Sequence, residues 1–397
     1  MTDINALQCF NEYLPVTQNW AFNLIDSLEN KKVKNTIFAI NYLDNNFYKD
    51  NFDFVHFPLK TISFNNEYQH QLILRKLLNQ IFIYFQKISH AYWLNYYLKK
   101  SNINIIHAHF SIVGWHFRAL KKHFNVPFII SFYGYDYESL IHNNLKWKQR
   151  YIILFKLASA ITCEGSHGAK TLLKLGCPVE KIHVIPLGVK VNNIKFVKRE
   201  KVSNKLKLLQ IASFREKKGH IFTIRAFANA LITMPNISLT LVGTGKLKES
   251  IKEEINKLQI SSKVIFIDSL LPYQMYELMA DNDVFIHPSC YASDLDCEGG
   301  APIVLLDAQA TGMPIISTFH CDIPDEVVSE STGILVDEKN VEEISNAIEF
   351  FYKMNKLDYN NYSINARLHI ENNFNILNNA KKLENLYYAC INNNMHV

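Results

Sequence analysis

Short apolar runs alternate with longer amphipathic segments along most of the chain. Runs such as Thr36–Asn41, Ile103–His107 and Val126–Phe132 have the length of buried strands, and segments with helical periodicity fill the intervals. The same alternation returns in the second half, with apolar runs at 207–214, 237–242, 264–267, 284–288 and 315–318. Repeated strand–helix units predict doubly wound, mostly parallel sheets, so the expected fold class is α/β.

A polar, charged stretch at 190–205 interrupts this alternation and is typical of a linker. At 397 residues the chain exceeds what one hydrophobic core usually supports. We therefore predict an N-terminal Rossmann-like domain over 1–190 and a C-terminal Rossmann-like domain over 206–360. The helical segment 364–391 follows the second domain and is expected to pack back on the first.

The segment 72–100 is amphipathic and rich in aromatic residues, with basic residues around it. A basic, aromatic helix of this kind can lie in a bilayer interface. The same pattern also fits a helix whose aromatic side chains pack inside the domain. The first half of the chain is basic and the second half acidic, which favours an anionic membrane surface as a partner of the first half.

Composition excludes several classes of protein. Hydrophobic residues make up 48% of the chain and aromatic residues 13%, which excludes general disorder. Seven scattered cysteines without a Cys-x-x-Cys pair favour a reducing cytosol over a disulfide framework or a zinc site. The first residues predict no signal peptide, and no apolar run has the length of a membrane span. The basic half carries no nucleic-acid-binding signature, so we expect no nucleic-acid partner.

The stretch from Asp296 to Thr318 is the most informative part of the chain. It predicts an acidic loop, a Gly-Gly turn, a helix that begins at Pro302 and a short buried strand. Free backbone N–H groups at such a helix N-terminus suit a diphosphate, and flanking carboxylates accept hydrogen bonds from sugar hydroxyls. The candidate donor-site residues of this stretch are Glu298, Gly299, Gly300, Ala301, Pro302 and Asp307.

This stretch resembles the Glu-Gly-x-Pro-x-x-x-x-Glu-Ala segment of retaining GT-B glycosyltransferases of family 4, in which two acidic residues bracket the donor. Here eight residues separate Glu298 from Asp307, where the family usually has seven, and the second acid is Asp rather than Glu. The resemblance covers roughly 105–390 and is strongest from 206 to 340. It implies the GT-B fold, in which two Rossmann-like domains face each other across a cleft.

The segment 213–219, Ser-Phe-Arg-Glu-Lys-Lys-Gly, follows a predicted strand, so its cations should lie at the sheet edge where α/β folds bind ligands. It resembles the family segment Gly-Arg-Leu-x-Glu-Lys-Lys-Gly, whose Arg and last Lys hold the donor diphosphate. Lys218 matches that lysine, while Ser213 occupies the Arg position and Arg215 lies two residues further on. The resemblance implies that Lys218, with Arg215 as a substitute, stabilises the departing diphosphate without a metal ion. A solvated basic turn is the alternative.

Two further patterns of the second half have competing interpretations. The segment Gly243-Thr-Gly245 is half of a dinucleotide fingerprint, and it either shapes the nucleotide pocket or serves local packing. The pair Asp294 and Asp296 has the spacing of a metal-binding motif, but its place before the Gly-Gly turn of a second α/β domain favours a solvated loop. We therefore predict no metal site.

In the first half, the segments 107–109 and 131–136 both end predicted strands and should face the interdomain cleft. They resemble the family's His-x-His and Phe-His-Gly-x-Asp segments, with Tyr133 where the family often has a histidine that contributes to sugar recognition. Asp136 is the better acidic candidate to bind an acceptor hydroxyl. We assign His109 to the acceptor side as a packed strand-end histidine, together with Thr17 and Gln18, which only their position supports.

The resemblance implies a cytoplasmic, peripheral hexosyltransferase that moves a sugar with retention from a nucleotide-sugar donor to a glycan or lipid-linked glycan acceptor. Capsule, exopolysaccharide or lipopolysaccharide synthesis is the process it suggests. Such enzymes require no protein nucleophile, so we expect no cofactor and no required metal ion. Two alternatives stay open: a non-catalytic nucleotide-sugar-binding scaffold subunit, and a sugar phosphorylase or epimerase on the same fold.

Overall fold

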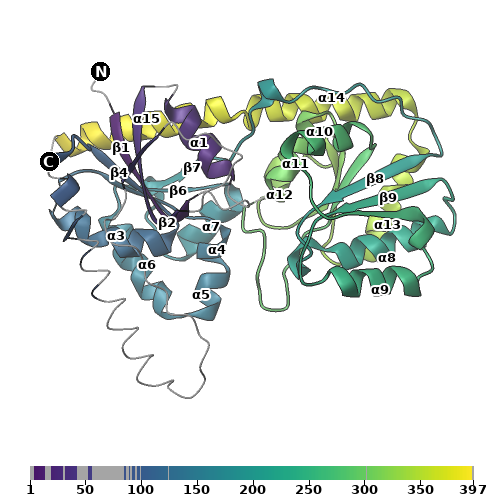
Figure 1. Cartoon of the computed structure of the whole chain (residues 1–397), viewed down its shortest axis with the longest axis horizontal. Helices are drawn as coiled ribbons and strands as arrows, with labels where there is room; N and C mark the ends of the chain where they lie inside the picture. The colour runs from purple at the N-terminus through teal and green to yellow at the C-terminus, as the bar shows by residue number, and fades with distance from the viewer. Residues whose placement is uncertain are drawn as a thin grey trace, which may run out of the picture.

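In this computed structural model the chain forms two α/β domains that lie side by side along the long axis of the molecule (Figure 1). The structure describes residues 4–13, 19–29, 32–42, 52–55, 85, 89, 92, 93, 96–98, 100–123, 125–300 and 302–395. Most of the aromatic segment 72–100, and the positions of Thr17, Gln18 and Ala301, therefore lie outside the described residues. Within these ranges, no helix has both the length and the apolar character needed to cross a membrane.

The N-terminal domain is built on a seven-stranded parallel sheet of order β3-β2-β1-β4-β5-β6-β7. Its strands are β1 (Ile4–Tyr13), β2 (Val33–Tyr42), β3 (Asp53–Val55), β4 (Ile105–His109), β5 (Phe128–Ser131), β6 (Ala160–Cys163) and β7 (Ile182–Val184). The central strands β4, β5 and β6 are buried at every position, as expected for parallel strands covered on both faces. The predicted doubly wound sheet is confirmed for this half.

Alternate residues of the central strands point into two separate cores. Ile106 and Ile130 pack into the core beneath α3 and α6, whereas Ile105 and Ile129 pack into the core beneath the C-terminal helix. The helices of this domain are α1 (Asn19–Glu29), α3 (Ser111–His123), α4 (Gly134–Tyr137), α5 (Ser139–Asn143), α6 (Lys146–Leu157) and α7 (Ser166–Lys174).

The C-terminal domain has a six-stranded parallel sheet of order β10-β9-β8-β11-β12-β13. Its strands are β8 (Leu206–Ile211), β9 (Ile237–Val242), β10 (Val264–Ile267), β11 (Val284–His287), β12 (Ile315–Thr318) and β13 (Gly333–Val336). Its helices are α8 (His220–Leu231), α9 (Lys248–Lys257), α10 (Pro272–Ala280), α11 (Ile303–Ala310), α12 (Ile323–Glu326) and α13 (Val341–Lys353). The strands predicted at 207–214, 237–242, 264–267, 284–288 and 315–318 all correspond to observed strands.

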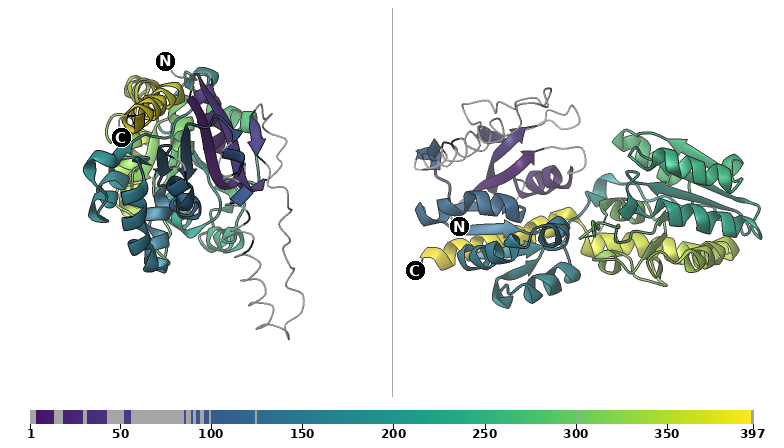
Figure 2. Two further views of the ribbon diagram at one scale, coloured as in Figure 1. Left: turned by 90° about the vertical axis from the view of Figure 1, so that its left-hand side faces the viewer. Right: turned by 90° about the horizontal axis from the view of Figure 1, so that it is seen from below.

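The C-terminal segment consists of two helices and not of the single helix predicted over 364–391. Helix α14 (Lys356–Asn373) lies on the second domain and α15 (Ile376–Met395) runs along the first, as the yellow ribbon in Figures 1 and 2 shows. The helix is interrupted because the N–H of Val189 donates to the carbonyl of Phe374, and the carbonyl of Val189 accepts from the N–H of Ile376. Beyond this break, α15 packs against the N-terminal sheet.

Candidate active site

The candidate site lies where the carboxyl ends of β8 and β11 leave the C-terminal sheet. Strand β9, which follows β8 in the chain, pairs with one side of β8, and β11 pairs with the other side of β8. The chain therefore departs in opposite directions from these two neighbouring strands, and such a switch point is where open α/β sheets bind ligands. The loops 212–219 and 288–302 flank it.

The loop after β8 contains a 3₁₀ turn over Glu216–Lys218 and ends at Gly219. Gly219 has a left-handed backbone (φ 67°), and a Cβ placed there would lie 1.9 Å from the carbonyl oxygen of Pro288. The close approach of the loop after β11 thus requires glycine at this position. Gln210 Nε2 donates to the carbonyl of Lys218 at 2.8 Å, which fixes the turn beneath the lysine.

Lys218 and Glu298, the two residues predicted at the centre of the site, form an ion pair with Nζ 2.7 Å from Oε2. Ser289 Oγ donates to the other carboxylate oxygen at 3.0 Å, and His287 Nε2 lies 3.6 Å from it. Burial raises the pKa of Glu298, but Lys218 and His287 outweigh it and hold the pKa well below its usual value. The side chains of Glu298 and Lys218 are 6% and 16% exposed, so a fixed cation lies beside an ionised carboxylate.

Asp296 is ion-paired with the basic turn after β8. Arg215 lies 2.6 Å from one of its carboxylate oxygens and Lys217 lies 3.1 Å from the other. The interpretation of Asp294 and Asp296 as a merely solvated loop is therefore wrong for Asp296, since two cations neutralise it. The Arg215 side chain is 59% exposed, so it lies at the rim of the site and not at its centre.

Gly243 and Gly245 have positive φ angles of 147° and 153°. A Cβ at Gly243 would lie 2.0 Å from the carbonyl oxygen of Ala212, and one at Gly245 would lie 2.6 Å from that of Phe214. Phe214 N–H also donates to the carbonyl of Thr244 at 2.9 Å. Close packing against the loop after β8 accounts for both glycines, and this contact supports the turn that carries Lys218.

The Gly-Gly turn of the loop after β11 touches the N-terminal domain. A Cβ on Gly134 would lie 1.9 Å from Gly299 Cα, and Tyr137 Oη donates to the carbonyl of Gly299 at 3.2 Å. A Cβ on Gly300 would lie 2.0 Å from a carboxylate oxygen of Glu164. The two domains are thus in direct contact at the turn predicted to hold a diphosphate.

The helix after this turn begins at Ile303, and Pro302 has an extended backbone (φ −69°, ψ 118°) as the residue before it. The prediction that Pro302 opens the helix is therefore wrong by one residue. Asp307 lies within α11 and accepts a hydrogen bond from Tyr276 Oη at 2.8 Å. Burial raises the pKa of Asp307 from 3.8 to about 6, although the bond from Tyr276 lowers it.

On the N-terminal side, His109 is fully buried and bonded through both ring nitrogens. Its Nδ1 lies 2.9 Å from Tyr133 Oη and its Nε2 lies 3.0 Å from Gln8 Oε1. Burial, followed by the charge of the neighbouring His107, holds the pKa of His109 well below its usual value. His109 is therefore a neutral, packed strand-end residue that orients Tyr133.

Asp136 is also fully buried. Its Oδ1 accepts from the N–H and the hydroxyl of Ser111 at 2.9 and 2.6 Å, and its Oδ2 accepts from the N–H of Tyr133 at 2.9 Å. Both carboxylate oxygens are thus used to fix the turn after β5. In this conformation Asp136 is a structural residue, which argues against the prediction that it binds an acceptor hydroxyl.

Three acids at the domain contact, two of them buried, were missed in the sequence. Glu164 follows β6, while Asp322 and Glu326 follow β12, so the rule that ligands meet the carboxyl ends of strands would have found them. Burial raises the pKa of Asp322 to about 7 and that of Glu326 well above its usual value. His167 N–H donates to Asp322 across the domain contact at 2.7 Å.

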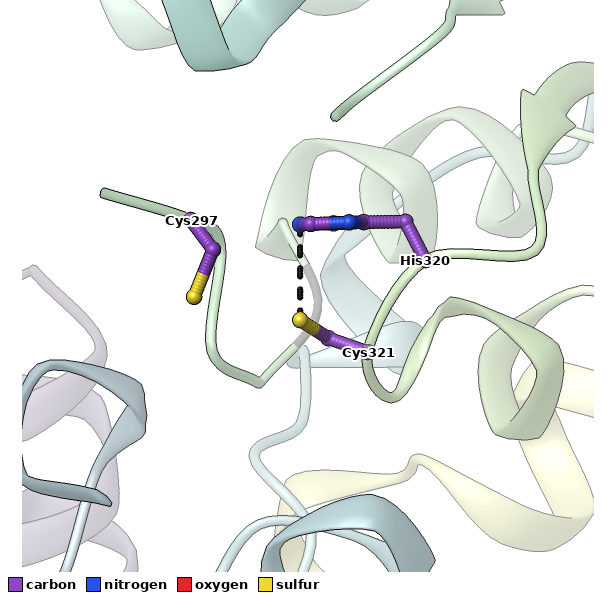
Figure 3. Close-up of side chains that lie close together, drawn as sticks. All are labelled: Cys297, His320 and Cys321. Atoms are coloured by element: carbon purple, nitrogen blue, oxygen red, sulfur yellow. Dashed lines mark hydrogen bonds between the residues drawn. The ribbon is translucent and has the colours of Figure 1, made fainter. Parts of the chain in front are cut away.

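A second missed group joins the loops after β11 and β12. Ligating atoms of Cys297, His320 and Cys321 all lie within 4.8 Å of one another (Figure 3). Nothing in the sequence alone indicates that these three side chains lie together, and the expectation of no zinc site stays a prediction. A Cys-x-x-Cys search does not detect the group, because 23 residues separate the two cysteines in the sequence.

Two parallel sheets that meet at their carboxyl ends, with a paired cation and carboxylate at the switch point of the second, define a two-domain protein of the GT-B class. Solved structures agree with this assignment. A glycosyltransferase from Rickettsia africae superposes with a TM-score of 0.75 at 15% identity, covering 98% of this chain and 99% of that one. The predicted GT-B fold is confirmed.

Two family models divide the chain between them. Residues 18–193 match "Glycosyltransferase Family 4" and residues 191–369 match "Glycosyl transferases group 1". The chain therefore belongs to the glycosyltransferases, with a family 4 domain followed by a group 1 domain.

Two curated relatives illustrate the family. The amylovoran biosynthesis glycosyltransferase AmsK of Erwinia amylovora is 28% identical over 51% of this chain, which spans about half (50%) of that protein. The UDP-Gal:alpha-D-GlcNAc-diphosphoundecaprenol alpha-1,3-galactosyltransferase of Escherichia coli is 24% identical over 73% of this chain and 76% of that protein.

Proposed function

We propose that this protein is a glycosyltransferase of polysaccharide synthesis that moves a hexose, with retention, from a nucleoside-diphosphate sugar to a glycan or lipid-linked glycan. The observation that carries the proposal is Lys218, held by Glu298 at the switch point between β8 and β11. A fixed, largely buried cation at this place is suited to the charge that develops on a departing diphosphate.

In the proposed reaction, the bond between the sugar's anomeric carbon and the diphosphate breaks, and the acceptor oxygen bonds to the same face of that carbon. The acceptor proton passes to an oxygen of the departing diphosphate, so no side chain acts as nucleophile. Lys218 neutralises the leaving group, and the N-terminus of α11 adds backbone N–H groups. We propose that this step needs neither a cofactor nor a metal ion at the diphosphate.

Arg215 and Asp307 have supporting roles in the proposal. Arg215 at the rim would attract the donor before it binds, because an exposed charge acts mainly on encounter. Asp307 would accept a hydrogen bond from a hydroxyl of the nucleotide. Tyr133, oriented by His109, would offer its hydroxyl to the transferred sugar.

The names of the two relatives support the donor and acceptor classes, since one names a UDP-sugar and a polyprenol-diphosphate glycan and the other an exopolysaccharide. A lipid-linked acceptor places the reaction at a membrane surface. We therefore propose a cytoplasmic protein that associates peripherally with the inner face of the membrane. Co-sedimentation with anionic liposomes at low salt tests this association, and no co-sedimentation would exclude it.

Nucleotide binding is the direct test of the proposed site. Thermal unfolding is measured with UDP, GDP, ADP, dTDP and CMP for the unmodified protein and for Lys218→Ala. A ligand at about 100 times its dissociation constant stabilises the fold by about 2.7 kcal/mol, which is readily measured. We expect one nucleoside diphosphate to stabilise the protein and the effect to be largely lost in Lys218→Ala. Stabilisation by none of them would favour the scaffold alternative.

A further inference from the structure

Cys297, His320 and Cys321 come from two neighbouring loops of the C-terminal sheet. Cys297 lies in the loop after β11, and His320 and Cys321 directly follow β12. His320 is fully buried and Cys297 is 4% exposed. Figure 3 shows the imidazole reaching from the second loop toward the two sulfur atoms. Cys321 Sγ lies 3.4 Å from His320 Nε2.

The hydrogen bonds of His320 determine which of its ring nitrogens is available as a ligand. Its Nδ1 lies 2.6 Å from a carboxylate oxygen of Glu338, which can only accept. Its Nε2 lies 3.2 Å from the N–H of Glu298, which can only donate. These partners assign the proton to Nδ1 and the lone pair to Nε2, the atom that faces Cys321, and a metal ion bound at Nε2 replaces the N–H of Glu298 as the partner of that lone pair. A carboxylate behind the imidazole is the usual second partner of a metal-bound histidine.

We propose that Cys297, His320 and Cys321 bind a zinc ion. Two thiolates and one imidazole form a soft ligand set that selects zinc over magnesium or calcium. In a tetrahedral zinc site, Zn–S and Zn–N bonds of usual length put sulfur and nitrogen about 3.6 Å apart. The observed separation of 3.4 Å between Cys321 Sγ and His320 Nε2 fits this geometry. A water molecule completes the coordination.

The site joins the loop that carries Glu298 to the loop after β12. Cys297 is the residue before Glu298 in the chain, and Lys217 Nζ donates to the carbonyl of Cys297 at 2.7 Å. A bound ion ties the backbone at Cys297 to the loop after β12. It therefore restrains the position of the neighbouring Glu298 carboxylate. We therefore assign the zinc a positioning role, because it acts on the Glu298 carboxylate through the neighbouring Cys297.

Metal content and cobalt spectroscopy test the proposal on the full chain, prepared without a polyhistidine tag and in the presence of a thiol reductant. After incubation with zinc and gel filtration, we expect about one zinc ion per chain. Replacement by cobalt is expected to give the visible bands of a tetrahedral ion and a near-ultraviolet thiolate-to-cobalt band. A chain that retains no zinc and gives no such bands would overturn the proposal, whether or not it transfers sugar.

Substitutions identify the ligands. Cys297→Ser and Cys321→Ser are each expected to abolish the thiolate-to-cobalt band or reduce its intensity by about half. Glu338→Gln is expected to weaken zinc affinity by about 10- to 100-fold, because the imidazole loses its carboxylate partner. Cys177→Ser, at a buried cysteine of the N-terminal domain, is the matched control and should leave zinc binding unchanged. Unchanged cobalt spectra in both ligand variants, or a Cys297–Cys321 disulfide under the reducing conditions, would contradict the assignment.

Discussion

The two sheets present different chemistry at the edges where they meet. On the C-terminal sheet the side chains are charged and paired, with Lys218 against Glu298 at the centre. On the N-terminal sheet they are buried and neutral, as in the pair of His109 and Tyr133. Fixed charge suits an anion, whereas neutral hydroxyl and imidazole groups suit an uncharged sugar. Together with the proposed function, the contrast predicts that the two halves of a nucleotide sugar contact different domains.

Removing the central cation should break this contrast most strongly. In Lys218→Ala the leaving diphosphate loses its counter-charge and Glu298 loses its partner, so we expect turnover to fall by about 10²- to 10³-fold. Initial rates of transfer, with the donor identified by nucleotide binding, measure the effect. Lys252→Ala, at an exposed lysine of α9, is the control and should retain full activity. A rate within twofold of the unmodified protein would exclude the role given to Lys218.

The contact between the domains is tested by Gly134→Ala. The added methyl group meets Gly299 backbone atoms, so the domains must separate, while the backbone at Gly134 has no positive φ that would strain the fold locally. We expect turnover to fall by about 10²-fold, because a displacement of about 1 Å at the reacting groups has this effect. Nucleoside diphosphate affinity, which depends on the C-terminal domain, should stay unchanged. Loss of both together would show that the two domains do not divide the substrate.

Asp307→Asn tests the buried carboxyl on the charged side. The pKa of Asp307 is about 6 in the folded protein and 3.8 for the ordinary group. As pH rises, the carboxyl of the unfolded chain therefore releases its proton before that of the folded protein. The free energy of unfolding falls between about pH 4 and pH 6 and stays lower above pH 6. The variant should be more stable than the unmodified protein at pH 8, by up to about 3 kcal/mol, and this gain should shrink toward pH 4. Urea unfolding at several pH values measures it, and a pH-independent difference would contradict the assignment.

Tyr133→Phe tests the neutral side. The change removes the hydroxyl partner of His109 Nδ1 and leaves a buried ring nitrogen without a hydrogen bond. We expect a loss of about 1–2 kcal/mol in the free energy of unfolding. The loss should not depend on salt concentration, since no charge is removed, and a strong salt dependence would show that the network is not neutral.

The smallest effect is expected for Arg215→Ala. The arginine is exposed and its partner Asp296 retains Lys217, so the stability change should be below about 1 kcal/mol. We expect the Michaelis constant for the donor to rise a few-fold at low salt and to approach the unmodified value at high salt. A loss of turnover as large as that of Lys218→Ala would place Arg215 at the centre of the site.

Much of the fold could be predicted from local pattern. The strand–helix alternation identified both sheets, because parallel strands buried on two faces are short continuous apolar runs. The loop that carries Lys218 and the loop that carries Glu298 could also be expected at one place, since both follow strands and carboxyl ends of parallel strands share an edge. The break between α14 and α15 could not be predicted, because it depends on hydrogen bonds to Val189, which is distant in the sequence.

Side-chain partners were harder to predict than elements. Nothing local to Asp136 reveals that Ser111, 25 residues away, takes up one of its carboxylate oxygens. The group of Cys297, His320 and Cys321 forms only when β11 and β12 pair, so neither loop alone carries a metal-binding spacing. The pairing of Lys218 with Glu298 likewise requires β8 to lie beside β11.

The chain passes between the domains twice at one place, once after Gly188 and once at Phe374–Ile376, and Val189 hydrogen-bonds to both sides of the second passage. A bridge between two crossing segments resists sliding of one past the other, so we expect bending at this place to be the main motion between the domains. Such bending would open and close the contact between Gly134 and Gly299. In the proposed reaction, one rotation would then both admit the donor and bring the charged and neutral faces together.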